Sequence, residues 1–132
     1  MGRPEWRCCG DSGTAALALV VAAGFALIVF VTLANVVTMQ FTRGALHAAT
    51  DEAVRAGSRA DAPVAVCEAR ARAVLDGLLG PAARDDVDVS CALAGDPPTV
   101  RARADAALVP WLPGLPAWSF SVRSDAVQEV LP

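Results

Sequence analysis

The feature that most constrains this chain is a long run near its N-terminus, from Ser12 to Thr42, that contains no charged residue. A helix needs about 20 apolar residues to cross roughly 30 Å of hydrocarbon, so the stretch from Ala15 to Phe41 can span a bilayer with room for tilt. A cleavable secretory signal has a shorter apolar region, about 7–15 residues, before a small-residue cleavage site. We therefore expect a membrane-spanning helix over 14–41. The alternative is a buried core helix, which the rest of the chain is too small to cover on all sides.

The helix is expected to continue beyond the membrane as a stalk over residues 42–60. Ionisable residues recur there at every fourth position, and apolar residues form a second stripe beside them. Asp51 also precedes Arg55 by four positions, the favourable order for an ion pair along a helix. One continuous helix is thus predicted from about Thr14 to Ser58. The ionisable stripe is Arg43, His47, Asp51, Arg55 and Arg59, and the apolar stripe is Leu46, Ala49, Ala53 and Ala56.

The remaining residues, 61–132, are expected to form a small domain outside the membrane. Asp61 and Pro63 are suited to the start of a second helix that runs from about Pro63 to Leu79, and Gly80-Pro81 is suited to its end. Its apolar face would carry Cys67, Ala71, Val74, Leu75 and Leu78.

Three segments with alternating apolar and polar residues follow this helix, at 86–93, 99–106 and 118–127. The first two are joined by a turn rich in glycine and proline at 94–98. The fold class predicted is α+β: a long N-terminal helix whose first half spans the membrane, a short second helix and a three-stranded antiparallel sheet. The apolar stripe of the stalk is expected to pack on that sheet.

Two of the four cysteines are predicted to form a disulfide. Cys67 lies on the apolar face of the second helix, and Cys91 lies on the inward face of the first strand, so both point into one core. The alternative is a pair of ordinary buried thiols. Because disulfides form in oxidising compartments, a bond between them places the C-terminal domain outside the cytoplasm. Cys8 and Cys9 have no histidine or second cysteine pair nearby to complete a zinc site, and we interpret them as reduced thiols in a cytoplasmic tail.

The sequence holds little that catalysis would need. His47 is the one histidine, and it lies in the charged stripe without a placed nucleophile or carboxylate. Asp85, Asp86 and Asp88 form an acidic group, but a calcium loop needs more oxygen ligands, and alternate aspartates suit the polar face of a strand. No phosphate-binding glycine loop is present. The net charge of −3 does not favour a nucleic-acid surface. We therefore expect no enzymatic activity, cofactor, metal, small-molecule substrate or nucleic-acid partner.

An apolar loop between the second and third strands carries two large side chains, Trp111 and Leu112. Its prolines prevent regular structure, and its apolar side chains need a surface to rest on. They either contact a partner or the membrane surface, or they cap the open end of the sheet.

The segment Gly13-Thr14-Ala15-Ala16-Leu17-Ala18-Leu19-Val20 resembles the N-terminal signature of TadE-like proteins (the TadE/TadG family), which are pseudopilins of the tight-adherence, or Flp-type, branch of type IV pili. Residues 42–58 resemble the polar helix end that follows the signature in the family, and residues 100–127 resemble its closing hairpin. In this family a prepilin peptidase cuts after the glycine. The resemblance therefore implies cleavage between Gly13 and Thr14.

This sequence departs from the family pattern at Ala18, where the fifth residue after the glycine is usually a glutamate. In pilins that glutamate pairs with the free amine of a neighbouring subunit, so Ala18 cannot supply the contact. Some tip subunits of related systems also lack this glutamate. The two interpretations are a subunit at the start or tip of a filament and an unprocessed membrane anchor.

The function expected from these features is that of a structural or assembly component, a minor pilin or pseudopilin, of a tight-adherence type IV pilus. Its partners would be the lipid bilayer, other pilin or pseudopilin subunits and the pilus assembly platform. It would reside in the cell membrane or the pilus, with residues 1–13 in the cytoplasm and the domain of residues 61–132 outside. The alternative is a membrane-anchored extracytoplasmic binding or regulatory module unrelated to pili.

Overall fold

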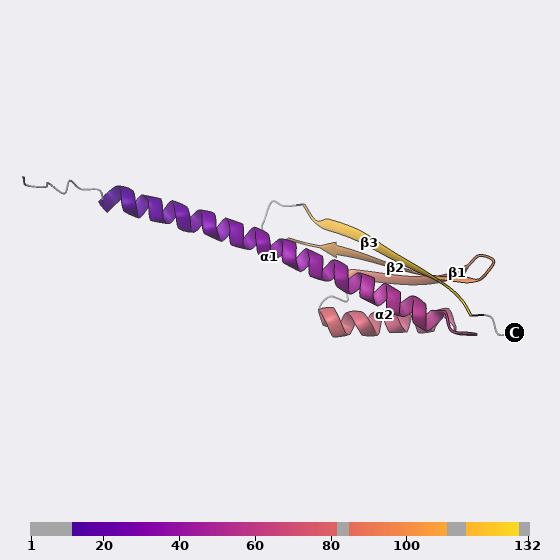
Figure 1. The fold of residues 1–132 in the computed structure, drawn as a ribbon. Coiled ribbons are helices and arrows are strands. Elements are labelled where there is room, and N and C mark those ends of the chain that lie inside the picture. Colours follow the sequence, from indigo (N-terminus) through magenta and orange to yellow (C-terminus); the bar gives the residue numbers. More distant parts are fainter. Residues whose placement is uncertain (1–11, 82–84, 111–115, 130–132) are drawn as a thin grey trace, which may run out of the picture. The chain divides into compact units, whose positions relative to one another are not determined.

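The structure, a computed structural model, describes residues 12–81, 85–110 and 116–129 (Figure 1). Within these residues the chain forms two helices and one antiparallel sheet, which confirms the predicted α+β class. The chain divides into two compact units, residues 1–36 and 37–132, and each is described by itself. The elements are α1 (Ser12–Gly57), α2 (Val64–Leu79), β1 (Val87–Ala94), β2 (Thr99–Leu108) and β3 (Trp118–Val127).

The described part of the first unit is helical and leaves its large apolar side chains uncovered. Leu17, Phe25 and Phe30 are each more than 60% exposed. Among the described residues, one helix, α1, is long and apolar enough to cross a membrane, and none of its most apolar window is buried. Its polar side chains bond to the helix itself: Thr32 Oγ1 donates to the Ile28 carbonyl and Asn35 Nδ2 to the Val31 carbonyl, both at 2.8 Å. Such local bonds lower the cost of polar side chains in lipid.

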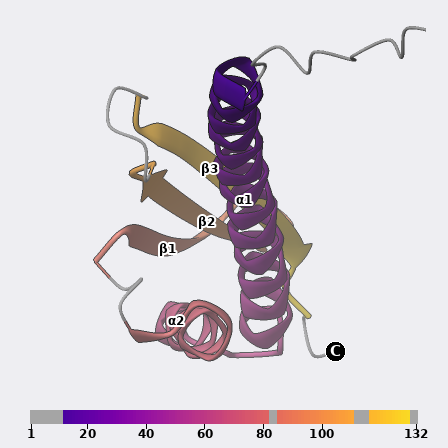
Figure 2. The ribbon, with the colours of Figure 1, turned by 90° about the vertical axis from the view of Figure 1, so that its left-hand side faces the viewer.

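The second unit has two layers, because α2 and the segment of α1 from Val37 onward lie on one face of the sheet (Figure 2). The strands are in the order β1-β2-β3, and both neighbouring pairs are antiparallel. Their alternating residues fill the space between sheet and helices. The buried core consists of Leu46, Ala49, Ala53 and Val54 of α1, of Cys67, Ala71 and Leu75 of α2, and of Val89, Val100, Ala102, Ala104, Ala106 and Val122 of the sheet.

The predicted stripes of the stalk are confirmed. Leu46, Ala49 and Ala53 are buried, Ala56 is half-buried, and all five ionisable residues of the stripe are exposed. The predicted apolar face of α2 holds for Cys67, Ala71 and Leu75. It is wrong for Leu78, which lies on the last turn and is 45% exposed.

The connection between the helices differs from the prediction. Asp61 does not cap α2; it takes a left-handed backbone conformation with φ 59°, which turns the chain between the helices. Pro63 occupies the N-cap position, without a side-chain cap, and α2 starts at Val64. Aspartate is among the few non-glycine residues that tolerate this conformation. At the other end, Gly80 closes α2 at φ 78° with its N–H bonded to the Asp76 carbonyl, as predicted.

Strand β2 extends two residues beyond the predicted end at Ala106. The extension arises from pairing with β3, because Ala107 lies opposite Ser119 and Leu108 lies opposite Trp118. The tight link between β1 and β2 is turned at Gly95, whose φ of 96° favours glycine.

Candidate functional site

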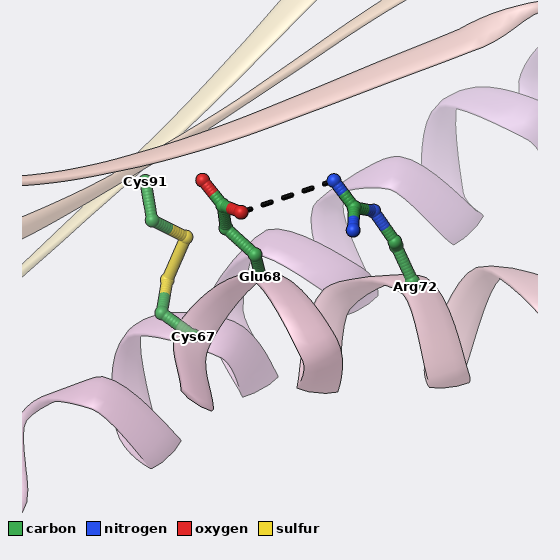
Figure 3. Close-up of a disulfide and its surroundings, with 4 residues drawn as sticks. All are labelled: Cys67, Glu68, Arg72 and Cys91. Atoms are coloured by element: carbon green, nitrogen blue, oxygen red, sulfur yellow. Dashed lines mark ion pairs between the residues drawn. A yellow bond between two sulfur atoms is a disulfide. The ribbon is translucent and has the colours of Figure 1, made fainter. Parts of the chain in front are cut away.

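The strongest predicted pair of residues, Cys67 and Cys91, forms a disulfide between α2 and β1 (Figure 3). The two Cα atoms are 6.3 Å apart, and the residues are separated by 24 positions in the sequence. Cys67 is fully buried, whereas Cys91 is half-buried. The prediction is confirmed. The bond fixes the second helix to an edge strand that would otherwise have one neighbouring strand only.

A polar contact joins α1 to β3 on the opposite side of the core. Ser124 Oγ donates to Asp51 Oδ1 at 2.6 Å and lies 3.1 Å from Thr50 Oγ1. The Thr50 hydroxyl is fully buried and bonds back to the carbonyls of Leu46 and His47. A polar side chain in this core is therefore satisfied without water. This contact was missed in the sequence, although a serine among the apolar inward positions of β3 was a signal for it.

The same contact displaces an expected ion pair. Asp51 was predicted to pair with Arg55 along the helix, but the described residues show no ion pair between them. The carboxylate turns toward Ser124 instead. A tertiary hydrogen bond to a fixed hydroxyl has replaced a weak helical pair, which contributes only about 0.2–0.5 kcal/mol.

A second polar contact joins the two helices. Arg70 Nη2 of α2 lies 2.8 Å from Glu52 Oε1 of α1. The hydrogen bond from Arg70 and the charge of the same guanidinium hold the pKa of Glu52 below its usual value of 4.5. Because both side chains are substantially exposed, we take this pair as a modest clamp rather than as a reactive centre.

The face of the sheet away from the helices is polar and carries paired charges. Arg103 holds Asp105 with two hydrogen bonds of 2.6 and 2.8 Å. The hydrogen bond from Arg103 lowers the pKa of the Asp105 carboxyl. The same hydrogen bond to Asp105 raises the pKa of the Arg103 guanidinium. Arg101 of β2 lies 3.6 Å from Asp125 of β3. Two of the arginines on this face are therefore paired with aspartates, and the face is not a single-sign patch.

A hollow of about 430 Å³ lies between the C-terminal half of α2 and the start of β1. Its lining includes the ionisable residues Arg72, Asp76 and Asp88 and the apolar residues Leu75 and Val89. These side chains include no cysteine, serine or histidine that could act as a nucleophile or base. Within the residues that the structure describes, no group of three or more His, Cys, Asp or Glu side chains is placed to hold a metal ion.

The other predicted site residues belong to the first unit or fall outside the described residues. Gly13, Thr14 and Ala18 lie in the first turns of α1 and are exposed. Nothing comes within 4 Å of the position that a Cβ on Gly13 would take. Trp111 and Leu112 lie outside the described residues, as do Cys8 and Cys9.

Comparison of the chain with protein-family models, with curated proteins and with solved structures found no match.

Proposed function

We propose that this protein is a membrane-anchored structural subunit, a minor pilin or pseudopilin of a tight-adherence type IV pilus. The observation that carries the proposal is the double character of α1. Its N-terminal part is apolar and uncovered, and it opens with the pilin-like segment from Gly13 to Val20. Its C-terminal part supplies Leu46, Ala49 and Ala53 to the core of a sheet domain. One helix thus serves both as an anchor and as the spine of the domain.

The disulfide supports an external location for the domain. A cysteine pair is kept oxidised in secreted or periplasmic compartments and is reduced in the cytoplasm. The Cys67–Cys91 bond therefore favours a topology in which residues 1–13 face the cytoplasm and the sheet domain faces outward. In this topology the protein is an integral component of the cell membrane and, after assembly, of the pilus.

Processing after Gly13 would leave Thr14 with a positively charged amine at the membrane edge. An ordinary pilin offers a glutamate that neutralises such an amine on its neighbour, and a buried charge is costly unless it is paired. Ala18 removes that acceptor while leaving the amine able to meet a glutamate on another subunit. This asymmetry suits a low-copy subunit at the start or tip of a filament. Its partners are then other pilin subunits and the assembly platform.

The chemistry on the domain surface supports a structural role in place of a catalytic one. Arg101 and Arg103 on the exposed face of the sheet are each paired with an aspartate, and the residues that line the hollow beside α2 include no cysteine, serine or histidine. The apolar loop with Trp111 and Leu112 stays a predicted contact with a partner or the membrane. The alternative function is a membrane-anchored extracytoplasmic binding or regulatory module, which the missing glutamate also fits.

Mass spectrometry of the mature N-terminus tests the proposal. In cells with an active prepilin peptidase, the mature protein is expected to begin at Thr14. A Gly13→Leu variant, which retains the helix but blocks the cut, should keep the leader. If the wild-type protein keeps Met1 or Gly2 in those cells, the pilus assignment fails and the anchored module replaces it.

A further inference from the structure

We propose that copies of this chain associate side by side through the two open edges of the sheet, with β3 of one copy pairing in parallel with β1 of the next. Both strands are edge strands. In the described part of the chain, no backbone hydrogen bond reaches residues 87–94 or 118–127 from outside the sheet. An open edge presents a row of unpaired N–H and C=O groups, which is a template for another strand.

The register of β3 against β2 shows which backbone N–H and C=O groups of β3 do not bond to β2. The N–H of Gln128 bonds to the Pro98 carbonyl at 2.8 Å, one step beyond the Thr99–Val127 pair. Hydrogen-bonded and non-bonded pairs alternate along an antiparallel ladder. The backbone groups that point away from β2 are therefore those of Ser119, Ser121, Arg123, Asp125 and Val127.

The free groups on β1 follow in the same way. The N–H of Ala107 bonds to the Asp86 carbonyl at 3.1 Å, one step before the Val87–Ala106 pair. The backbone groups of β1 that point away from β2 are those of Val87, Val89, Cys91 and Leu93.

Parallel pairing of these two edges keeps the faces of the sheet in phase. In a parallel pair of strands, a residue whose backbone N–H and C=O point toward the neighbouring strand lies opposite a residue whose own N–H and C=O point away from the first strand. Arg123 would thus lie opposite Ser90, or opposite Asp88 after a shift of two residues. All three side chains belong to the exposed face. Because β1 and β3 are each antiparallel to β2, they run in the same direction, and a sideways displacement generates the next copy without reversing it.

Charge favours this pairing. Arg123 makes no ion pair within the described residues, unlike Arg101 and Arg103, and Asp88 on β1 is likewise exposed and unpaired there. Parallel pairing of β3 with β1 brings these two opposite charges within reach, whereas pairing of β1 with β1 brings aspartates together.

The same pairing would also cover Val127 at the end of β3, whose side chain is 58% exposed. Val127 lies opposite Thr99 and Thr99 lies opposite Ala94, so these residues share one face at one end of the sheet. With Arg123 opposite Ser90, Val127 of one copy lies opposite Ala94 of the next. Because this pairing is head-to-tail, it extends into a row rather than closing as a dimer.

The inference concerns the sheet domain, does not depend on the pilus assignment and applies to copies in the membrane, before any copy enters a filament. Its test uses the full chain in membranes, with Cys8 and Cys9 replaced by serine. Two differently tagged copies are expressed together, one with Ser90→Cys on β1 and the other with Ser121→Cys on β3. A short bifunctional thiol reagent should link the two tags, and intramolecular linking cannot produce this mixed product. Self-linking of Ser121→Cys alone would show a two-fold β3 pairing and overturn the proposal, as would the absence of any linked product.

Substitutions at Arg123 separate the backbone contribution from the charge. Arg123→Asp should lower the yield of mixed product about fivefold, and adding Asp88→Arg in the same chain should restore it. Arg123→Gln removes only the charge. Arg123→Pro removes the charge and also the backbone N–H, which faces away from β2. An edge strand tolerates proline at such a position. The proline variant should lose the mixed product while its melting temperature stays that of Arg123→Gln. Equal yields from these two variants would exclude strand pairing.

Discussion

Ser124 of β3 and Asp51 of α1 are joined by a hydrogen bond of 2.6 Å, although 73 positions separate them in the sequence. The bond sits at the rim of the core, next to the fully buried Thr50 hydroxyl. It joins α1 to β3 beside the core, whereas the buried Leu46 and Ala49 determine which side of α1 faces the sheet.

Removing this hydrogen bond should destabilise the domain by a small, measurable amount. Ser124→Ala is expected to lower the free energy of unfolding by about 1 kcal/mol, the typical net contribution of one hydrogen bond. Thr50 keeps its bonds to backbone carbonyls, so no buried group is left unpaired. Chemical denaturation of the full chain in micelles measures the change. Ser119→Ala, on the exposed face of the same strand, is the control, and an equal loss there would rule out the α1–β3 contact as the cause.

The end of α1 is expected to tolerate no side chain. Gly57 is buried, and a Cβ on it would lie 3.1 Å from both Cys67 Cβ and Val100 Cγ1. Gly57→Ala should therefore cost about 1–3 kcal/mol of stability through overpacking, in spite of the better helix propensity of alanine. In contrast, Gly77 of α2 has nothing within 4 Å of the corresponding position, and Gly77→Ala should stabilise by about 0.5–1 kcal/mol. Thermal melting of the two variants should move in opposite directions; a stabilising Gly57→Ala would contradict the close approach.

The link between the helices should depend on pH in a defined direction. The pKa of Glu52 is lowered from 4.5 by the hydrogen bond from Arg70. A carboxyl with a depressed folded-state pKa contributes stability that is present above its unfolded value and is lost as the pH falls through the folded value. Glu52→Gln should thus lower the melting temperature slightly at pH 7, and the difference from the wild type should vanish in strong acid, below both pKa values. A difference that stays constant with pH would show that the charge of Glu52 does not matter.

Much of the fold could be predicted because the periodicities are strong and agree with each other. The four-residue stripe from Arg43 to Arg59 and the two-residue alternation of β2 each indicated one buried face, and both faces meet in the core. The disulfide could be predicted for the same reason, since a helical and a strand pattern independently pointed Cys67 and Cys91 inward. The periodicity of apolar residues determines which face of a helix or strand is buried when that face is continuous and apolar.

The contacts that could not be predicted depend on how elements cross. Asp51 has a helical neighbour at Arg55, but its actual partner depends on the position of β3 over α1. The pairing of Glu52 with Arg70 depends equally on the packing of two helices. Asp61 was misassigned because aspartate favours both caps and left-handed turns, and the sequence alone does not decide between them. Exposed pairs of this kind carry too little energy to leave a pattern in the sequence.

The disulfide should be the largest single contribution to the stability of the domain among the changes considered. It closes a loop of 24 positions between α2 and β1, and the loop-entropy estimate for such a cross-link is about 3 kcal/mol. Without it, α2 is held against β1 by the packing of its apolar side chains, which include Ala71 and Leu75. In chains whose tail cysteines, Cys8 and Cys9, are replaced by serine, the reductant acts on this one bond. Reduction should then lower the free energy of unfolding by about that amount.

A double Cys67→Ala, Cys91→Ala variant supplies the matched control for this experiment. It should unfold at the lower denaturant concentration of the reduced protein, and it should not respond to reductant, because it has no bond to break. The double variant also separates the loss of the cross-link from the chemistry of free thiols in the core. If the oxidised and reduced wild-type domains unfold at the same denaturant concentration, the bond contributes nothing to stability, and the core packing alone holds α2 against the sheet.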